Sequence, residues 1–452
     1  MVGLARQGKA AARYLAARGA KVTVSDRKTA DQLSAEVAEL DGLDIEFILG
    51  GHPPELLVGA DLLCLSGGVS AGLPLAQQAR LRGIRLTNDA QLFLEAAPAP
   101  TIGITGSAGK TTTTALVGRI AAAALEPLGR HAWVAGNIGR SPLADVDKMS
   151  AGDWIVLELS SFQLELMTAS PHVVAVLNVT PNHLDRHQTM VAYREAKARI
   201  LEFQGLEDIA VLGREDPGAW GLRDRARGRT VSFGTARHVE GEGTFVKEGA
   251  IWWAGHDGEV RLLETETIEL RGAHNLINVL AASAIAVASG FSPEAIQAGV
   301  RGYRGEPHRL TFVRHVAGAD WYDDSIATAP ERALAALRSF DEPLILLAGG
   351  RDKDLPWSDF AQIVIRRVDH VVLFGEAGPL IELALRSVMQ GSTDMRLETI
   401  DRVARLDEAV EAAARRVSPG DVVLLSPGGT SFDEFPDFAA RGDRFQERVK
   451  NL

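Results

Sequence analysis

The amino-acid sequence predicts an α/β protein of three domains. Short apolar runs alternate with helical stretches along the chain, which is typical of parallel sheets covered by helices. The chain has 452 residues, and a single hydrophobic core rarely grows that large, since domains average roughly 150 residues. Several apolar runs end in a glycine or serine turn, and open α/β sheets bind their ligands beyond such strand ends.

The first domain is expected over residues 1–97 and has a Rossmann-like pattern. Residues 21–24 and 62–65 predict strands, and residues 10–18 predict a helix. Only two residues precede the first glycine, whereas a buried strand normally has about five. We therefore expect the natural reading frame to start further upstream.

A glycine turn opens this domain. Gly3 and Gly8 are spaced like the outer glycines of a dinucleotide-binding turn, and Asp26 lies near the end of the second strand, where such folds bind a ribose. The segment departs from that pattern at Ala5. A nicotinamide dehydrogenase would leave the second glycine loop, described below, without a role, so another nucleotide ligand fits the sequence better.

Two further domains follow a proline-containing run at residues 97–100. Proline fixes its own φ and restricts the residue before it, so a boundary is expected at residue 97. The second domain is expected over residues 98–302 and the third, again Rossmann-like, over residues 303–452. In the second domain we predict strands at residues 101–105, 154–157 and 173–179, helices at 111–125, 190–203 and 275–289, and a strand-rich insert near 228–270. In the third domain we predict strands at residues 344–348, 370–374 and 421–426.

The strongest local signal is a phosphate-binding loop, in which an apolar strand leads into Gly106-Ser107-Ala108-Gly109-Lys110-Thr111 and a helix. Glycines allow successive backbone N–H groups to face phosphate oxygens, a lysine adds a cation, and a hydroxyl can hold magnesium. The strict Gly-x-x-x-x-Gly-Lys-Thr spacing is not met, because Ile104 stands where the first glycine is needed. The alternative is an ordinary glycine-rich turn, which Gly-Lys-Thr between a strand and a helix disfavours.

Other candidate groups follow later strands. Glu158 comes directly after an apolar run, and beside a phosphate loop its carboxylate could reach a magnesium ion. Residues 182–187 hold several potential metal ligands, but their spacing fits no standard zinc pattern and by itself favours packing roles. By spacing alone, Lys197 is predicted to lie on a solvated helix face.

Charge and composition exclude several classes of protein. Lys plus Arg number 48 against 59 Asp plus Glu, a net charge of -11, which disfavours a nucleic-acid partner. Hydrophobic residues make up 46%, as in globular proteins, and no apolar stretch reaches the roughly 20 residues of a membrane span. The single cysteine, Cys64, lies in an apolar run, so its side chain is expected to fill the core. A chain with one cysteine can form no internal disulfide, which is typical of proteins in a reducing compartment. We expect a cytoplasmic protein without membrane insertion.

Several segments together resemble the ATP-dependent Mur ligases over the whole chain. These segments are residues 106–111, 158–165, 177–180, 183–185, 193–197, 274–275 and 307–309, with residues 431–433 and 441–442 near the C-terminus. The resemblance implies a uridine-nucleotide domain, a central P-loop mononucleotide-binding ATPase domain and a C-terminal domain that brings the amino acid. Residues 160–165 and the two C-terminal segments resemble the branch of the family that adds glutamate.

The resemblance also implies a reaction in peptidoglycan precursor synthesis. ATP would phosphorylate the carboxylate of UDP-N-acetylmuramoyl-L-alanine, and the amine of glutamate, by default the D-isomer, would attack the acyl phosphate to leave an amide. We expect the protein to be a monomer. The L-glutamate-adding branch of the family and a folylpolyglutamate-type ligase stay open as alternatives. A relative that only binds nucleotide is disfavoured, because the phosphate and metal groups are all present.

Site residues follow from the same resemblance. ATP would contact Gly106, Ser107, Ala108, Gly109, Lys110, Thr111, Thr112, Asn275, Asn278, Arg309 and Asp324. Two Mg²⁺ ions would be held by Thr111, Glu158, His183 and a carbamylated Lys197, and Lys110, His183 and Lys197 would be catalytic. The uridine nucleotide would contact Arg6, Gln7, Asp26, Arg27, Gly68 and Asn137, and glutamate would contact Thr328, Lys353, Ser431 and Phe438.

The sequence departs from the family pattern in three segments. Ile326 stands where a lysine is common, Gly428 and Gly429 replace an alanine and a cysteine, and Asn182 replaces an aspartate. The first two departures lie near the incoming amino acid, which is why the isomer of glutamate stays open.

Overall fold

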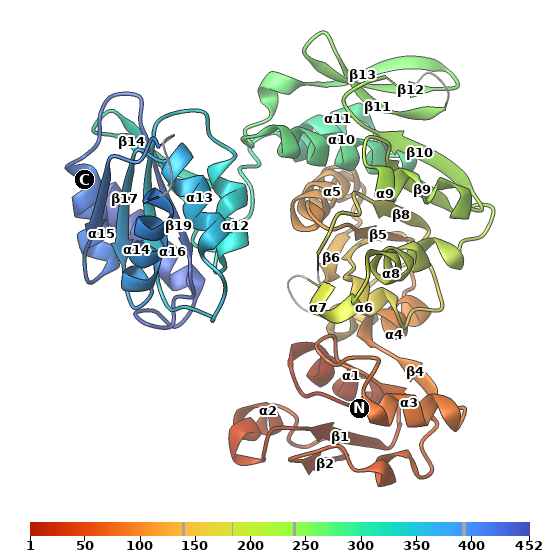
Figure 1. Cartoon of the computed structure of the whole chain (residues 1–452). Coiled ribbons are helices and arrows are strands. Elements are labelled where there is room, and N and C mark those ends of the chain that lie inside the picture. The colour runs from red at the N-terminus through yellow and green to blue at the C-terminus, as the bar shows by residue number, and fades with distance from the viewer. Residues whose placement is uncertain (138–140, 183, 238–240, 391–394) are drawn as a thin grey trace. The chain divides into compact units, whose positions relative to one another are not determined.

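The structure, a computed structural model, describes residues 1–137, 141–182, 184–237, 241–390 and 395–452. It contains two compact units, Met1–Ile268 with His274–Tyr303, and Glu269–Ala273 with Arg304–Leu452 (Figure 1). Within the described ranges, no helix is long and apolar enough to cross a membrane.

The N-terminal part of the first unit is a parallel sheet joined through Val2. Its strands are β1 (Val22–Asp26), β2 (Ile45–Leu49), β3 (Leu62–Cys64) and β4 (Arg85–Thr87), and its helices are α1 (Arg6–Ala17), α2 (Ser34–Ala38), α3 (Pro74–Leu81) and α4 (Asp89–Ala96). β1 pairs with β2 and β3 with β4, and Val2 forms parallel bridges with Ser25 on one side and Leu65 on the other. The expected first strand is therefore present as one bridging residue.

Cys64 lies at the end of β3 and is buried and unpaired with any other cysteine. It belongs to the same core cluster as Phe93 of α4 and Leu157 of the central sheet. Burial raises the pKa of its thiol to about 12, so the thiolate form is strongly disfavoured. The expectation of a core-filling cysteine is confirmed.

The central part of the first unit is a nine-stranded sheet in the order β13-β12-β11-β10-β9-β8-β5-β7-β6. The strands are β5 (Thr101–Thr105), β6 (Ala132–Gly136), β7 (Trp154–Glu158), β8 (Val173–Val176), β9 (Ile209–Gly213), β10 (Arg229–Phe233), β11 (Glu242–Lys247), β12 (Ala250–Gly255) and β13 (Gly258–Glu264). All neighbours from β6 to β11 are parallel, and β12 and β13 add an antiparallel extension. The strand-rich insert predicted near 228–270 corresponds to β10 to β13.

β8 is shorter than predicted. It ends at Val176 because the next residues leave the sheet to brace the phosphate loop: the Ser107 N–H donates to the Asn178 carbonyl at 3.0 Å.

Helices cover both faces of the central sheet. They are α5 (Lys110–Leu125), α6 (Ser161–Leu164), α7 (Leu184–His187), α8 (Met190–Glu202), α9 (Pro217–Trp220), α10 (Ala273–Ala288) and α11 (Pro293–Val300). Tyr193, Ala198 and Leu201 of α8 share a core cluster with Leu157 and Val176 of the sheet, whereas α5 packs on α11 and on β6 and β7. α8 begins at a Thr189 cap whose hydroxyl accepts from the Ala192 N–H at 3.1 Å.

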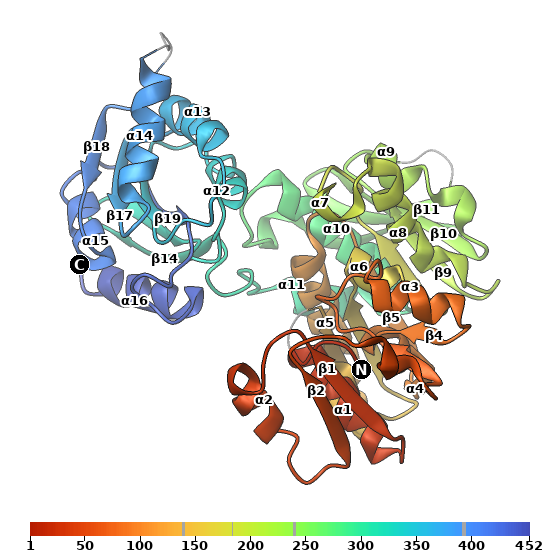
Figure 2. The same cartoon turned by 60° about the horizontal axis from the view of Figure 1, so that its bottom comes forward.

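The second unit is a six-stranded sheet between two helical layers (Figure 2). Its strands are β14 (Thr311–Val316), β15 (Ala319–Asp323), β16 (Leu344–Gly349), β17 (His370–Phe374), β18 (Thr399–Arg402) and β19 (Val422–Gly428), in the order β14-β15-β19-β16-β17-β18. β14 is antiparallel to β15, and the remaining neighbours are parallel. Helices α12 (Pro330–Leu337), α13 (Ser358–Arg367) and α14 (Gly378–Met389) bury one face, and α15 (Leu406–Ala414) and α16 (Phe438–Lys450) bury the other.

Candidate active site

The phosphate loop connects β5 to α5 and needs its glycines for two different reasons. Gly109 has φ +82°, and a Cβ there would lie 2.3 Å from Oδ1 of Asn278. A Cβ on Gly106 would lie 2.9 Å from the Cβ of Leu177. The loop is thus held close to its neighbours, and α5 begins directly behind it with its N–H groups pointing into the loop.

A bracing segment after β8 fixes the shape of this loop. The side chain of Asn178 accepts from the Ala108 N–H at 2.8 Å and donates to the Ala108 carbonyl at 3.1 Å. The Ser107 hydroxyl donates to the Thr180 carbonyl at 2.9 Å. These contacts preorganise the loop before any phosphate binds, and the residue roles predicted from the sequence did not include Asn178.

Lys110 lies at the start of α5 and folds back over the loop. Its ammonium donates to the carbonyls of Gly106 and Ser107 at 2.8 and 3.3 Å. Thr111 follows it in the first helical turn and is partly buried, and Thr112 is buried. A cation, a helix N-terminus and a hydroxyl are therefore within one turn of each other, which suits a magnesium-bound phosphate chain.

Lys197 of α8 is buried at the same loop, with 1% of its surface exposed. Its Nζ donates to the Gly106 carbonyl at 2.8 Å and to the Thr105 hydroxyl at 3.3 Å, and lies 4.8 Å from the centre of the Tyr193 ring. Burial lowers the pKa of Lys197 to about 6; the nearby Lys110 charge adds to this shift and Glu158 opposes it. The solvated helix face predicted from spacing alone is wrong.

Glu158 ends β7 and is buried with 2% of its surface exposed. Its Oε1 accepts from the Asn137 amide at 3.0 Å, while its Oε2 has no hydrogen-bond partner among the described residues. A buried carboxylate oxygen without a partner is unfavourable unless a cation or water satisfies it. The Glu158 carboxylate and the Thr111 hydroxyl are oxygen donors of the kind that Mg²⁺ prefers, so they fit the metal.

The structure describes one of the two histidines in residues 182–187. His183, expected to be catalytic and a metal ligand, lies outside the described residues. His187 is buried, with one ring nitrogen 2.9 Å from the Ser161 hydroxyl and the other 3.1 Å from a Glu165 carboxylate oxygen. His187 therefore has a packing role, as spacing alone favours. Among the described residues, no three His, Cys, Asp or Glu side chains form a metal-binding group.

Some of the residues expected at the uridine nucleotide contact the glycine turn at the start of α1. Gly3 has φ +91°, and a Cβ on Gly8 would lie 1.9 Å from the Gly3 carbonyl oxygen, so the turn requires both glycines. Asp26 accepts from the Leu4 N–H at 2.8 Å. Arg6 donates to the Asn137 carbonyl at 3.3 Å, which links this turn to the Glu158 region.

The other residues of the first unit that are expected to contact a nucleotide lie partly at the surface and partly beside the phosphate loop. Gln7 accepts from the Gly67 N–H at 3.1 Å, and Arg27 and Gly68 are exposed. Asn275 and Asn278 are both buried on α10, and Asn278 donates to Asn275 at 3.0 Å. Through Asn278, this pair lies against Gly109 of the phosphate loop.

In the second unit, the loop after β15 carries Asp324. This carboxylate is buried and accepts from the Ser426 hydroxyl at 2.8 Å and from the Leu310 N–H at 3.3 Å. Burial raises the pKa of Asp324 to about 7, against the effect of these hydrogen bonds and of Arg309.

Arg441 organises the neighbouring loops from inside the fold. Its guanidinium is 1% exposed and donates to the hydroxyl and carbonyl of Ser325, both at 2.9 Å, and to the Gly429 carbonyl at 3.1 Å. The predicted site residues did not include it. The sequence spacing could have indicated its burial, because Arg441 lies on the same helical face as the buried Phe445 and Val449.

The residues expected at glutamate lie on these loops. Ser431 is buried, and Thr328 is partly buried. Phe438 begins α16, and its carbonyl accepts from the Ser325 hydroxyl at 2.8 Å. Lys353 is exposed on the loop after β16.

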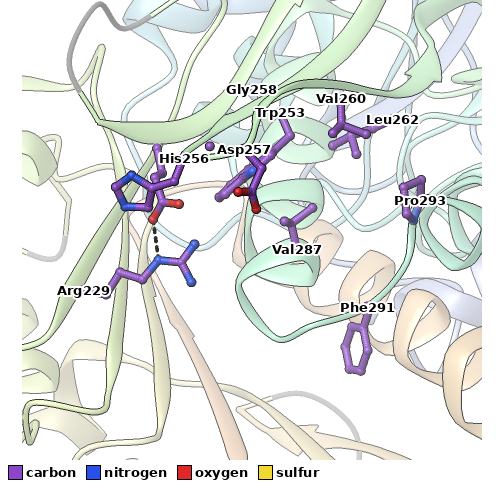
Figure 3. A pocket seen from close by; sticks show the side chains of 12 residues that line it. Arg229, Trp253, His256, Asp257, Gly258, Val260, Leu262, Val287, Phe291 and Pro293 are labelled. Atoms are coloured by element: carbon purple, nitrogen blue, oxygen red, sulfur yellow. Dashed lines mark hydrogen bonds and ion pairs between the residues drawn. The ribbon is translucent and has the colours of Figure 1, made fainter.

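A surface cavity of about 590 Å³ lies away from all of these residues. It is bordered by the β12–β13 turn and by Val287, Phe291 and Pro293, with Arg229 ion-paired to Glu242 at its edge (Figure 3). None of the expected site residues lines it.

The fold and the glycine loop thus define a mononucleotide-binding α/β protein, and its sequence matches three descriptions of one family. These are the Mur ligase MurD-like N-terminal domain over residues 1–88, the Mur ligase middle domain over residues 104–286, and the Mur ligase glutamate ligase domain over residues 308–429. The chain belongs to the Mur ligase family. Its predicted three-domain α/β architecture is confirmed.

Curated relatives match the whole chain. A UDP-N-acetylmuramoylalanine--D-glutamate ligase of Symbiobacterium thermophilum is 40% identical, over all of this chain and 97% of its own length. A protein of the same name from Geotalea uraniireducens is 38% identical over the same shares.

Solved structures share the fold. The UDP-N-acetylmuramate-alanine ligase MurC of Thermotoga maritima aligns with a TM-score of 0.57 at 20% identity, over 100% of this chain and 98% of that one. MurF ligase of Thermotoga maritima in complex with ADP aligns with a TM-score of 0.52 at 16% identity, over 87% and 99%.

Proposed function

We propose that this protein is an ATP-dependent ligase that joins D-glutamate to UDP-N-acetylmuramoyl-L-alanine. The observation that carries the proposal is the arrangement of Lys110 and Lys197 on the same Gly106 carbonyl, beside a Glu158 carboxylate with an unsatisfied oxygen. Such a site gathers phosphate-binding and metal-binding groups in one buried place. The name of the relatives that are 38–40% identical over the full length supports the choice of substrates.

In the proposed reaction, the phosphate loop holds ATP, and Lys110 balances the charge that develops on the transferred phosphoryl group. The substrate carboxylate attacks the γ-phosphorus, ADP leaves, and an acyl phosphate forms. The amine of glutamate then attacks the acyl carbon, and phosphate leaves with the electron pair of the broken C–O bond while the amine loses a proton. The free carboxylate is a poor electrophile, and phosphorylation gives it a leaving group.

We further propose that Mg²⁺ and a carbamate on Lys197 belong to this site. Thr111 and Glu158 would hold one ion, and His183 with the modified Lys197 would support a second. Mg²⁺ supplies charge neutralisation for the phosphates when it is bound. The lowered pKa of Lys197 supports the modification, because the neutral amine is the form that attacks carbon dioxide, with loss of one proton to give an anionic carbamate.

The remaining assignments are part of the same proposal. Arg6, Gln7, Asp26, Arg27, Gly68 and Asn137 would contact the uridine nucleotide, Asn275, Asn278, Arg309 and Asp324 would contact ATP, and Thr328, Lys353, Ser431 and Phe438 would contact glutamate. The domains would span residues 1–97, 98–302 and 303–452, and the enzyme would act as a cytoplasmic monomer.

Phosphate release tests the proposal. The purified chain with Mg²⁺ and ATP should release phosphate only when UDP-N-acetylmuramoyl-L-alanine and glutamate are both present, because each is needed to complete turnover. Reactions that omit one substrate at a time are the controls. Release that instead requires a folate and L-glutamate would contradict the proposal and favour a folylpolyglutamate-type ligase.

A further inference from the structure

The loops after β15, β16 and β19 meet at the carboxyl edge of the second unit's sheet. The Gly428 N–H donates to the Ala327 carbonyl at 2.9 Å, joining the third loop to the first. Arg351 and Thr430 exchange two backbone hydrogen bonds of 2.8 Å each, joining the second loop to the third. The buried Arg441 donates to both the first and the third loop. The three loops therefore form one connected surface.

Helix α12 begins on this surface and places Arg332 in its first turn. A Cβ on Gly428 would lie 3.7 Å from the Cα of Pro330, the first residue of α12. The Arg332 N–H donates to the Ala329 carbonyl at 3.0 Å, which fixes the start of the helix. Arg332 is the first cation after Asp324 in chain order, because Ile326 carries no charge.

Three cationic side chains gather at these loops. They are Arg309, Arg332 and Lys353, and in the part of the chain that the structure describes none of them forms an ion pair. Arg332 and Lys353 are exposed at the surface. Reduced solvation and then the Arg309 guanidinium lower the pKa of Arg332, against the opposing charges of Asp324 and Glu331. Reduced solvation and then the charges of Arg332 and Arg441 lower the pKa of Lys353. The charges are thus close enough to repel one another.

The carboxylates nearby compensate for this charge only in part, because the pKa of Arg332 stays lowered although Asp324 and Glu331 oppose the shift. Asp352 accepts from the Trp357 indole N–H at 3.0 Å and from the Asp354 N–H at 2.9 Å, so both of its oxygens serve its own loop. Asp324 is buried, and its pKa is raised to about 7. An anionic ligand would therefore relieve the repulsion that remains among these cations.

We propose that Arg332 binds one carboxylate of the incoming amino acid while Lys353 binds the other. The proposal rests on the function proposed above and adds a specificity-determining residue to it. An α-amino dicarboxylate carries two anionic groups, and a guanidinium can bind a carboxylate through two parallel hydrogen bonds. Arg332 thereby supplies the cation that position 326 lacks.

Steady-state kinetics of Arg332→Ala test this role. The KM for glutamate should rise about tenfold or more, because a charge-assisted hydrogen-bonded pair is lost, while the KM for ATP should stay within about twofold. Arg332→Lys should recover part of the affinity, since it keeps the charge and loses the fork geometry. The matched control is Arg338→Ala, which removes an exposed arginine at the other end of the same helix.

The preference for glutamate over a second amino acid is a further measurement, and a general loss of structure would not change it. Glutamine replaces one carboxylate of glutamate with an amide, so the preference of kcat/KM for glutamate over glutamine should narrow about tenfold or more in Arg332→Ala and not in Arg338→Ala. An unchanged preference, or a rise in the KM for ATP alone, would assign Arg332 to another role and overturn the proposal. If the wild-type protein releases no phosphate in response to glutamate, the proposed function itself is overturned. If the wild-type protein does so and only the preference is unchanged in Arg332→Ala, the role of Arg332 alone is overturned.

Discussion

Lys110→Ala should lower kcat about a hundredfold or more, with a smaller change in the KM for UDP-N-acetylmuramoyl-L-alanine. The Lys110 ammonium lies over the phosphate loop, where it donates to the Gly106 carbonyl at 2.8 Å. Negative charge grows on the transferred phosphoryl group in the transition state, and removal of one group aimed at such charge typically has an effect of this size. Single-turnover measurement of ADP formation checks the expectation.

The control for this variant is Lys148→Ala. Lys148 is an exposed lysine of the same central domain, ion-paired with Asp145 at 2.6 Å. Its loss should leave turnover unchanged, because surface ion pairs contribute little and it lies on no site element. Thermal unfolding of both variants shows whether the fold is retained, and near-normal ADP formation by a folded Lys110→Ala would contradict the assigned role.

Lys197→Ala should reduce turnover at least as strongly, again about a hundredfold or more. The wild-type side chain is buried beside Glu158 and the phosphate loop, and its carbamate would place an anion where the unmodified side chain has an amine. Acetate added in increasing amounts should restore part of the activity, because a small carboxylate can enter the space left by the side chain. Acetate should not restore Lys110→Ala, which lacks a cation.

The modification itself has a readout besides activity. Wild-type protein equilibrated with ¹³C-labelled bicarbonate should show a carbamate carbon signal in its NMR spectrum, and Lys197→Gln should lack that signal while keeping most of the side-chain volume. A wild-type spectrum without the signal, together with full activity in carbonate-free buffer, would contradict a carbamylated Lys197.

The parts of the site that the sequence predicts are those built from neighbouring residues. Gly106 to Thr111 predict a strand, a glycine loop and a helix, and the structure has β5, the loop and α5 in those places. Glu158 is the last residue of β7, as its position after an apolar run predicts. Local sequence determines these features, because strand ends, glycine turns and helix starts depend on a few adjacent residues.

The parts that spacing misses depend on contacts between distant residues. The burial of Lys197 depends on how α8 packs against the central sheet, and its contact to Gly106 spans 91 positions in the chain. The bracing of Ala108 by Asn178 spans 70 positions, and the contact of Arg441 with Ser325 spans 116. The resemblance to a family recovers Lys197 but assigns no role to Asn178 or Arg441, whose effect is to hold loops in place.

Ligation with D- and L-glutamate in parallel tests the central claim most directly. Purified protein with ATP, Mg²⁺ and UDP-N-acetylmuramoyl-L-alanine should convert D-glutamate into the amide product, detected by mass spectrometry with matching release of phosphate, and should convert L-glutamate at a rate at least about a hundredfold lower. Equal or faster conversion of L-glutamate would contradict the D-glutamate assignment. Absence of product with both isomers from a folded, ATP-binding protein would contradict the ligase function itself.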